Sequence, residues 1–247
     1  MSDILKKLTK EMQKVQDPKR FTHTLGVEYT AAALAMRYGE DVERAQIAGL
    51  LHDCAKCMEN DKLLSACEKY HLPATDVEKR NPYLLHARVG SYLAKKEYKI
   101  EDPEILSAIL YHTTGRPGMT LLEKIIFTAD YIEPGRKQAP NLTQIRHLAF
   151  TDLDAAVTKI LEDTLEYLKS GVVDYEFRTT VVKELHKRED IEAIGQWLSG
   201  SRRYFLQNYK ESEQVIRPVF TSYSREQLEN FQQILRKTIP QVEIRGI

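Results

Sequence analysis

Cysteine is scarce in this chain, and the few cysteines present form no disulfide framework. The 247-residue sequence contains three, Cys54, Cys57 and Cys67, an odd number that favours a reducing, cytoplasmic setting. Cys54 and Cys57 have a C-x-x-C spacing, but no second pair exists to complete a zinc site. We interpret the pair as two small residues on a helix, with a redox pair as the less favoured alternative.

Long apolar runs and an excess of one charge are also missing. No uninterrupted apolar stretch approaches the roughly 18 residues that a membrane-spanning helix needs. Residues 1–16 are amphipathic and lack the apolar core of a secretory signal. The 36 basic residues balance 36 acidic ones, which argues against a protein that coats nucleic acid but allows a local basic pocket for a phosphorylated small molecule. We therefore expect a globular protein that binds neither membranes nor nucleic acids.

Helical periodicity, by contrast, extends over residues 1–170 and predicts an all-α fold there. Gly39 is suited to end one helix, because glycine adopts the left-handed conformation of a helix C-terminus. Asp102 followed by Pro103 is suited to begin another, because Asp caps free backbone N–H groups and Pro needs none. The expected helices span residues 2–16, 20–38, 41–57, 61–70, 84–98, 102–112 and 121–132, with one or two more over 141–169.

The last part of the chain has a different pattern, with β-branched and aromatic residues among helical segments. Its expected elements are a helix over 189–211, a strand over 215–223, a helix over 224–239 and a strand over 241–247. We therefore predict two domains. Residues 1–188 form an all-α helical bundle, and residues 189–247 form a small C-terminal appendage of α/β character.

Histidine and aspartate recur at well-separated positions on the predicted helices. Six of them follow the order H…HD…H…H…D, namely His23, His52, Asp53, His86, His112 and Asp130. Taken singly, each would more often be a hydrogen-bonded structural or surface residue, and we interpret the remaining histidines in that way. The combination favours function, because imidazole and carboxylate together bind iron, zinc, manganese or nickel. A carboxylate on the apolar helix around Asp130 is costly to bury unless it is paired or bound to a metal.

The segments around these residues narrow the interpretation. They are FTHTLGV (21–27), AGLLHDCAK (48–56), LLHARVG (84–90), AILYHTTGRPGM (108–119) and FTADYIEPGR (127–136). The ordered set resembles the HD-domain superfamily of metal-dependent phosphohydrolases, and the longer strings resemble its YqeK-type bacterial branch, the symmetrical dinucleoside-tetraphosphate hydrolases. The resemblance covers roughly residues 5–175 and implies an all-α HD-domain helical bundle. It does not extend to 190–247.

The resemblance also implies roles for individual residues. It implies a divalent metal, iron in the first place, with one ion or two and with manganese or another transition metal as a substitute. The implied metal ligands are His23, His52, Asp53 and Asp130. The implied catalytic residues are Asp53, His86, His112 and Lys56, where His86 and His112 either bind a second ion or contact phosphate. The implied substrate contacts are Arg20, His23, Asp53, His86, His112, Thr113, Asp130, Arg136, Ser170, Gly171 and Tyr175, and we add Arg116 as a further candidate cation.

These roles lead to a functional hypothesis. A metal-activated water would attack the polyphosphate chain in line with the leaving group, while cations neutralise the phosphate oxygens. We expect a cytoplasmic bacterial enzyme that splits diadenosine tetraphosphate symmetrically into two ADP. The alternatives are another HD-domain nucleotide phosphohydrolase or phosphodiesterase, and a nucleotide-sensing interaction module. A homodimer and a protein partner for the appendage stay open.

Overall fold

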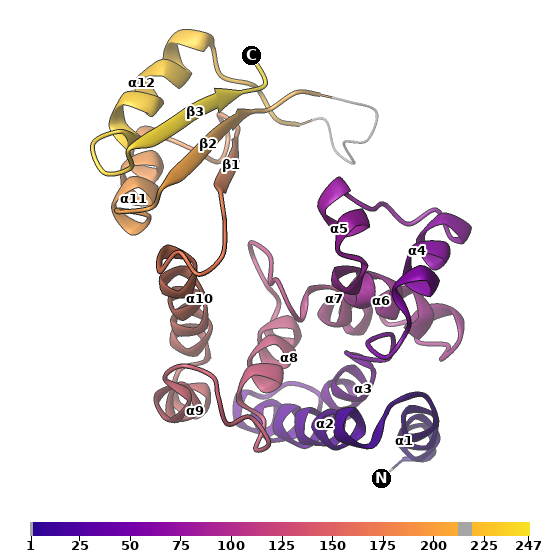
Figure 1. Ribbon diagram of the computed structural model, residues 1–247. Helices are drawn as coiled ribbons and strands as arrows, with labels where there is room; N and C mark the ends of the chain where they lie inside the picture. Colours follow the sequence, from indigo (N-terminus) through magenta and orange to yellow (C-terminus); the bar gives the residue numbers. More distant parts are fainter. Residues whose placement is uncertain (1, 212–218) are drawn as a thin grey trace. The chain divides into compact units, whose positions relative to one another are not determined.

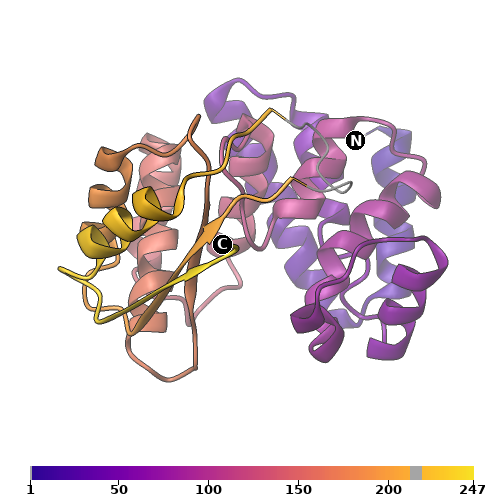
Figure 2. The same ribbon diagram turned by 90° about the horizontal axis from the view of Figure 1, so that it is seen from above.

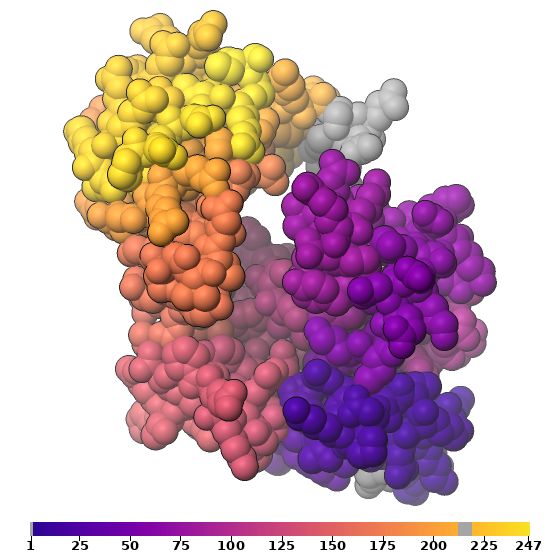
Figure 3. Space-filling view, in the orientation of Figure 1, coloured from indigo at the N-terminus to yellow at the C-terminus, as the bar shows by residue number. Residues whose placement is uncertain are grey.

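The computed structural model describes residues 2–211 and 219–247, and the chain divides into two compact units, Met1–Asp163 and Thr164–Ile247 (Figures 1 and 3). The helices of the first unit are α1 (Asp3–Val15), α2 (Pro18–Tyr38), α3 (Val42–Leu51), α4 (Asn60–Lys69), α5 (Asp76–Arg80), the 3₁₀ helix η1 (Pro82–Leu85), α6 (His86–Lys96), α7 (Pro103–Tyr111), α8 (Leu121–Ile132) and α9 (Leu142–Thr151). Helix α10 (Leu153–Lys169) extends across the division.

Local capping sets the ends of the helices that carry the site. The Asp17 side chain accepts hydrogen bonds from the backbone N–H groups at the start of α2, and Pro18 occupies its first position. Helix α2 ends at Gly39, whose φ of 76° is the left-handed conformation expected there. Asp102 caps α7 with Pro103 at its first position, and Thr120 begins α8 with a capping box. The predicted end of α2 and the predicted starts of α7 and α8 are confirmed, whereas α2 begins two residues before the predicted start at residue 20.

Apolar packing among α2, α3, α7 and α8 brings the ends of several helices together. Helix α2 packs against α3 and α8, and α7 packs against α6 and α8. Leu34, Leu50, Ile109, Ile125 and others like them are fully buried in this core. Burial of such a side chain stabilises the fold by roughly 1.5–3 kcal/mol. This packing of α3 against α2 and of α7 against α8 fixes the positions of the C-terminal ends of α3 and α7.

The second unit is a parallel three-stranded sheet with two crossover helices. Its strands are β1 (Phe177–Val181), β2 (Arg203–Asn208) and β3 (Gln241–Arg245), in the spatial order β1-β2-β3, and its helices are α11 (Arg188–Trp197) and α12 (Arg225–Leu235). In register, Phe177 pairs with Tyr204 and Tyr204 with Val242. Both helices lie on one face of the sheet (Figures 1 and 2), where Leu206, Leu228 and Leu235 form a separate buried core. The predicted α/β character of the appendage is confirmed.

Three predictions for the end of the chain differ from the structure. The expected helix over 189–211 is wrong in its second half, because 203–208 form β2, the central strand of the sheet. Part of the expected strand over 215–223 falls outside the described residues, and its described part, 219–223, is not a strand. Strand β1 was not predicted. The final strand and the helix capped by Ser224 are confirmed.

The boundary between the two compact units lies after Asp163, earlier in the sequence than the predicted boundary between residues 188 and 189. Strand β1 lies before that boundary but hydrogen-bonds along its whole length to β2. The structure therefore assigns β1 to the second unit, which begins at Thr164. Among the described residues, no helix is long and apolar enough to cross a membrane.

Candidate metal centre

The structure brings the six residues of the H…HD…H…H…D pattern into one cluster in the first unit. His23 lies in α2, His86 begins α6, His112 follows α7 and Asp130 lies in α8. Helix α3 ends at Leu51, so His52 and Asp53 come from the turn after this helix rather than from consecutive positions inside it. All but His23 and Asp130 are buried almost completely.

One half of the cluster consists of His23, His52 and Asp130, with Asp53 at its edge. The two imidazole Nε2 atoms of His23 and His52 lie 3.3 Å apart. Oδ1 of Asp130 lies 3.1 Å from Nε2 of His23 and 3.9 Å from Nε2 of His52. Oδ2 of Asp53 lies 3.4 Å from Nε2 of His52. His23, His52 and Asp130 thus offer three ligand atoms within 4.8 Å of one another, close enough to hold a single metal ion.

The other half of the cluster surrounds the second oxygen of Asp53. Oδ1 of Asp53 lies 3.4 Å from Nε2 of His86 and 3.5 Å from Nε2 of His112. These two Nε2 atoms lie 3.3 Å apart. His52, Asp53 and His112 form a second group of three mutually close ligand atoms. Asp53 therefore touches both halves, as a carboxylate that bridges two ions would.

The hydrogen bonds of the Nδ1 atoms show which nitrogen of each histidine ring can bind a cation. Nδ1 of His52, His86 and His112 each lies 2.7 Å from the backbone carbonyl oxygen of Gly49, Tyr83 and Ile109 respectively. Because a carbonyl oxygen only accepts hydrogen bonds, each Nδ1 carries the proton in the neutral ring and each Nε2 presents a lone pair. The lone pairs of His86 and His112 face each other and Asp53, an arrangement that repels unless a cation lies among them.

The pKa shifts agree with a site built for a cation. Burial, together with the neighbouring His112 and Lys56, lowers the pKa of His86 to about 4, so its ring is neutral near pH 7. Burial opposes ionisation of Asp53, but His52 and His112 hold the pKa of its carboxyl well below its usual value. Oδ1 of Asp53 is buried without a hydrogen-bond partner. Imidazole nitrogens around ionised carboxylates fit a divalent transition metal.

Three cations border the cluster. Nη1 of Arg20 lies 2.7 Å from Oδ2 of Asp53, and Nη2 of Arg136 lies 2.9 Å from Oδ1 of Asp130. Nζ of Lys56 lies 3.4 Å from both ring nitrogens of His86. The ends of these side chains are only partly buried, so each can contact a ligand that approaches the cluster from solvent.

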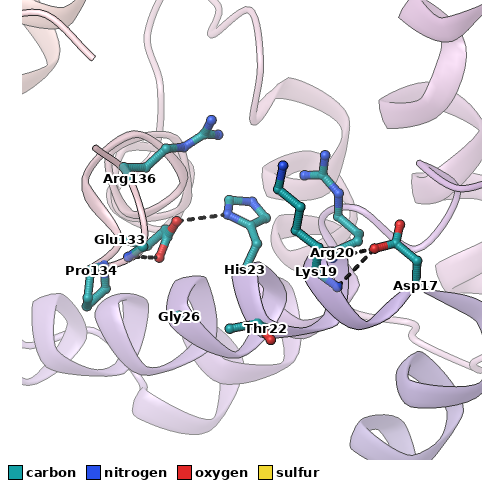
Figure 4. A pocket seen from close by; sticks show the side chains of 10 residues that line it. Asp17, Lys19, Arg20, Thr22, His23, Gly26, Glu133, Pro134 and Arg136 are labelled. Atoms are coloured by element: carbon teal, nitrogen blue, oxygen red, sulfur yellow. Dashed lines mark hydrogen bonds and ion pairs between the residues drawn. The ribbon is translucent and has the colours of Figure 1, made fainter. Parts of the chain in front are cut away.

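A pocket of about 650 Å³ opens beside His23, between the start of α2 and the turn after α8. The cationic ends of Lys19, Arg20 and Arg136 lie on the same side of α2 as the His23 ring (Figure 4). Pockets of this size, roughly 300–1,000 Å³, hold small-molecule ligands. The lining residues are Asp17, Lys19, Arg20, Thr22, His23, Gly26, Glu133, Pro134, Gly135 and Arg136.

Other residues expected at the site have other partners or belong to the second unit. Arg116 forms an ion pair at 2.8 Å with Glu123, a buried residue of the α8 capping box, so it is a structural residue rather than a free cation. Thr113 is exposed directly after His112. Ser170, Gly171 and Tyr175 belong to the second unit, where the Tyr175 hydroxyl accepts a hydrogen bond from the Arg202 backbone N–H. The six-residue cluster contains none of them.

The sequence interpretation missed two residues of the first unit. Glu133 is 4% exposed, and its Oε1 accepts a hydrogen bond of 3.2 Å from Nδ1 of His23. Arg146 of α9 donates to the backbone carbonyl oxygens of Ile132, Glu133 and Arg136, and so holds the turn that follows α8. The only signal in the sequence was the acidic residue in the EPGR string directly after an apolar helix.

Comparisons with known proteins identify the family and the fold. The HD-domain family model matches residues 20–135, which include all six residues of the cluster. The symmetrical bis(5'-nucleosyl)-tetraphosphatase of Bacillus subtilis (strain 168) is 45% identical over 149 residues, 60% of this chain and 79% of that protein. The protein of the same name from Staphylococcus aureus (strain NCTC 8325 / PS 47) is 40% identical over 152 residues, 61% of this chain and 77% of that protein.

A solved structure of an HD superfamily hydrolase also resembles this chain in fold and sequence. The crystal structure of a predicted HD superfamily hydrolase involved in NAD metabolism from Clostridium acetobutylicum is similar with a TM-score of 0.64 and 43% sequence identity. The similarity covers 69% of this chain and 90% of the Clostridium chain. The fold, the cluster and the relatives agree, and the chain belongs to the HD-domain family, in the branch of the symmetrical bis(5'-nucleosyl)-tetraphosphatases.

Proposed function

We propose that this chain hydrolyses dinucleoside tetraphosphates symmetrically, with diadenosine tetraphosphate as the substrate and two ADP as the products. The observation that carries this proposal is the buried cluster of four imidazoles and two carboxylates, which lies beside a pocket bordered by cations. The names of the relatives from Bacillus and Staphylococcus support the substrate class and the symmetry of cleavage. The pocket is large enough for a small-molecule ligand of the size of one nucleotide.

The metal ligands we propose are His23, His52, Asp53 and Asp130. A divalent cation bound by these residues supplies Lewis acidity, which activates water near neutral pH and neutralises charge on a phosphoryl group. We propose iron, with manganese as a substitute, and the mixed imidazole and carboxylate donors are compatible with both metals. The buried carboxylates keep their charge in this environment, which favours a cation over a neutral ligand.

Arg20 and Arg136 are the residues we propose to hold the phosphate oxygens. A guanidinium group has five N–H donors in a planar fork. Arg20 directs one of them to Asp53, and Arg136 directs two to Asp130, one of these to its backbone oxygen. The remaining donors have no partner among the described residues and can bind a polyphosphate, so both arginines can contact substrate without releasing the carboxylates. This arrangement places positive charge where negative charge develops in the transition state.

His86 and His112 have two alternative roles, and their hydrogen bonds favour one of them. Both rings donate from Nδ1 to backbone carbonyl oxygens, so in the neutral form their Nε2 atoms can only accept. A lone pair binds a cation but cannot donate to a phosphate oxygen. We therefore favour a second ion held by these two residues and Asp53 over direct contact with phosphate.

An anaerobic assay with ferrous iron tests the proposed function. Diadenosine tetraphosphate would be supplied, and the products separated by chromatography. ADP as the sole product is the expected result, whereas ATP with AMP would show asymmetric cleavage and contradict the proposal. Hydrolysis of other nucleotides alone would favour a different phosphohydrolase, and bound metal without any turnover would favour a nucleotide sensor.

Lys19 tests the role of the pocket. Its ammonium lies at the pocket, is exposed and has no ion-pair partner among the described residues. We expect Lys19→Gln to raise KM roughly two- to fivefold with little change in kcat, since an exposed ion pair contributes about 0.2–1 kcal/mol. The difference should shrink as salt is added. Steady-state kinetics at two ionic strengths would measure it, with Lys10→Gln, an exposed lysine of α1 outside the pocket, as the matched control.

A further inference from the structure

His23 differs from the other three histidines of the cluster in how its second nitrogen is held. The others donate from Nδ1 to neutral backbone carbonyl oxygens at 2.7 Å. His23 instead has Oε1 of Glu133 at 3.2 Å from its Nδ1 (Figure 4). The carboxylate of Glu133 is buried, so its contact with His23 is shielded from water. A negatively charged acceptor at this position makes the opposite nitrogen of the ring a stronger donor to a metal.

The surroundings of Glu133 are shaped to hold its carboxylate in one place. Its Oε2 accepts a hydrogen bond of 2.5 Å from the backbone N–H of Gly135. A Cβ atom added at Gly26 would lie 2.6 Å from Oε2, and one added at Gly135 would lie 2.9 Å from it. Such distances are too short for ordinary contacts, so two glycines leave the space that the carboxylate fills. Both oxygens of Glu133 therefore have a defined partner.

Glu133 also belongs to the turn that carries Arg136. The backbone carbonyl of Glu133 accepts from the Arg136 N–H at 3.0 Å and from the Arg146 guanidinium at 2.8 Å. The Arg136 guanidinium in turn reaches Oδ1 of Asp130 at 2.9 Å, and the same oxygen lies 3.1 Å from Nε2 of His23. These contacts form a closed circuit. Glu133 contacts Nδ1 of His23 and the backbone of Arg136, and Arg136 contacts Asp130, which lies against Nε2 of His23.

We propose that Glu133 is a positioning residue for the metal centre. It orients the His23 ring through Nδ1, increases the donor strength of Nε2 toward a divalent cation, and fixes the turn that presents Arg136. This inference deepens the proposed function and rests on it insofar as the cluster binds a divalent metal. It does not depend on which nucleotide is the substrate.

Metal affinity measured without substrate tests this role. Cobalt(II) is a suitable probe, because its visible absorption reports the geometry of its ligands. We expect Glu133→Gln to weaken cobalt binding about 10- to 100-fold, the usual effect of losing such a partner of a metal-binding histidine, and to change the absorption spectrum. Hydrolysis should fall at limiting metal and recover in part when the metal is raised, which loss of folding alone would not produce.

Two further variants keep the test decisive. Gly26→Ala leaves the charge of Glu133 in place but displaces its carboxylate, and we expect it to weaken cobalt binding in the same direction. Glu123→Gln is the matched control, because Glu123 of α8 is a buried glutamate like Glu133 but pairs with Arg116 and Ser107 instead of the cluster. It should leave cobalt affinity and spectrum unchanged.

Each outcome separates this inference from the proposed function. Wild-type affinity and an unchanged spectrum in Glu133→Gln would overturn the role of Glu133, whatever the substrate. A wild-type protein that binds cobalt but does not cleave diadenosine tetraphosphate would contradict the proposed function, while the comparison of the Glu133 variants would still decide this inference. A wild-type protein that binds no metal would overturn both. If Glu133→Gln does not fold, Gly26→Ala gives the answer.

Discussion

Asp53→Asn should abolish hydrolysis, with kcat/KM reduced by on the order of 10³-fold or more, which corresponds to about 4 kcal/mol of transition-state stabilisation. Asp53 contacts both halves of the cluster, one with each carboxylate oxygen. Its Oδ2 lies 2.7 Å from Arg20 and 3.4 Å from His52, and its Oδ1 lies 3.4 Å from His86 and 3.5 Å from His112. Asparagine keeps the shape but removes the charge, and its N–H₂ group offers no lone pair to a cation at the position of one carboxylate oxygen.

The metal content of Asp53→Asn identifies the cause of the lost activity. We expect bound iron or cobalt to fall together with activity, because a ligand and a bridging charge are lost at once. Circular dichroism should show that the helices remain, and Asp61→Asn, an exposed aspartate of α4, should behave like the wild type. Full metal content with full activity in Asp53→Asn would refute the assignment of Asp53 as a ligand.

The six residues of the cluster could be predicted from the sequence because their types are informative in themselves. Histidine and aspartate on apolar helices are costly to bury without a cation or a partner, so their joint occurrence indicates a site. Glu133 could not be found in this way, because its role depends on how the turn after α8 folds back on α2. Arg116 has the right charge, but only the fold shows that it pairs with Glu123.

The helices of the first unit could be predicted from the sequence, whereas strands β1 and β2 of the second unit could not. The reason is that helix ends depend on local residues and these strands depend on distant ones. Caps such as Asp102 and the glycine at residue 39 act locally, so the sequence alone shows where these helices begin and end. In β2, by contrast, three consecutive residues, Tyr204, Phe205 and Leu206, are buried, and the alternation typical of a half-exposed strand is absent. A short buried strand of this kind has the same apolar pattern as a buried helix, and only pairing with β1 and β3 distinguishes them.

Removal of the metal with a chelator should stop hydrolysis completely and lower the thermal stability of the native chain. A ligand that binds only the native state stabilises it by about 2.7 kcal/mol when its free concentration is 100 times its Kd. For a chain of this size each kcal/mol shifts Tm by roughly 2–4 °C, so we expect a fall of about 5–10 °C. Thermal unfolding followed by circular dichroism, with and without chelator, would measure it, and added iron or manganese should restore both stability and activity.

His52→Ala separates the cluster from adventitious metal binding in this experiment. His52 belongs to both groups of close ligand atoms, so its loss should remove the dependence of Tm on metal while the helices stay folded. An undiminished metal-dependent shift in His52→Ala would place the stabilising ion elsewhere in the chain. The number of ions restored per chain then tests the role of His86 and His112, since two ions require both halves of the cluster to be filled, whereas one ion would leave these two residues to contact phosphate.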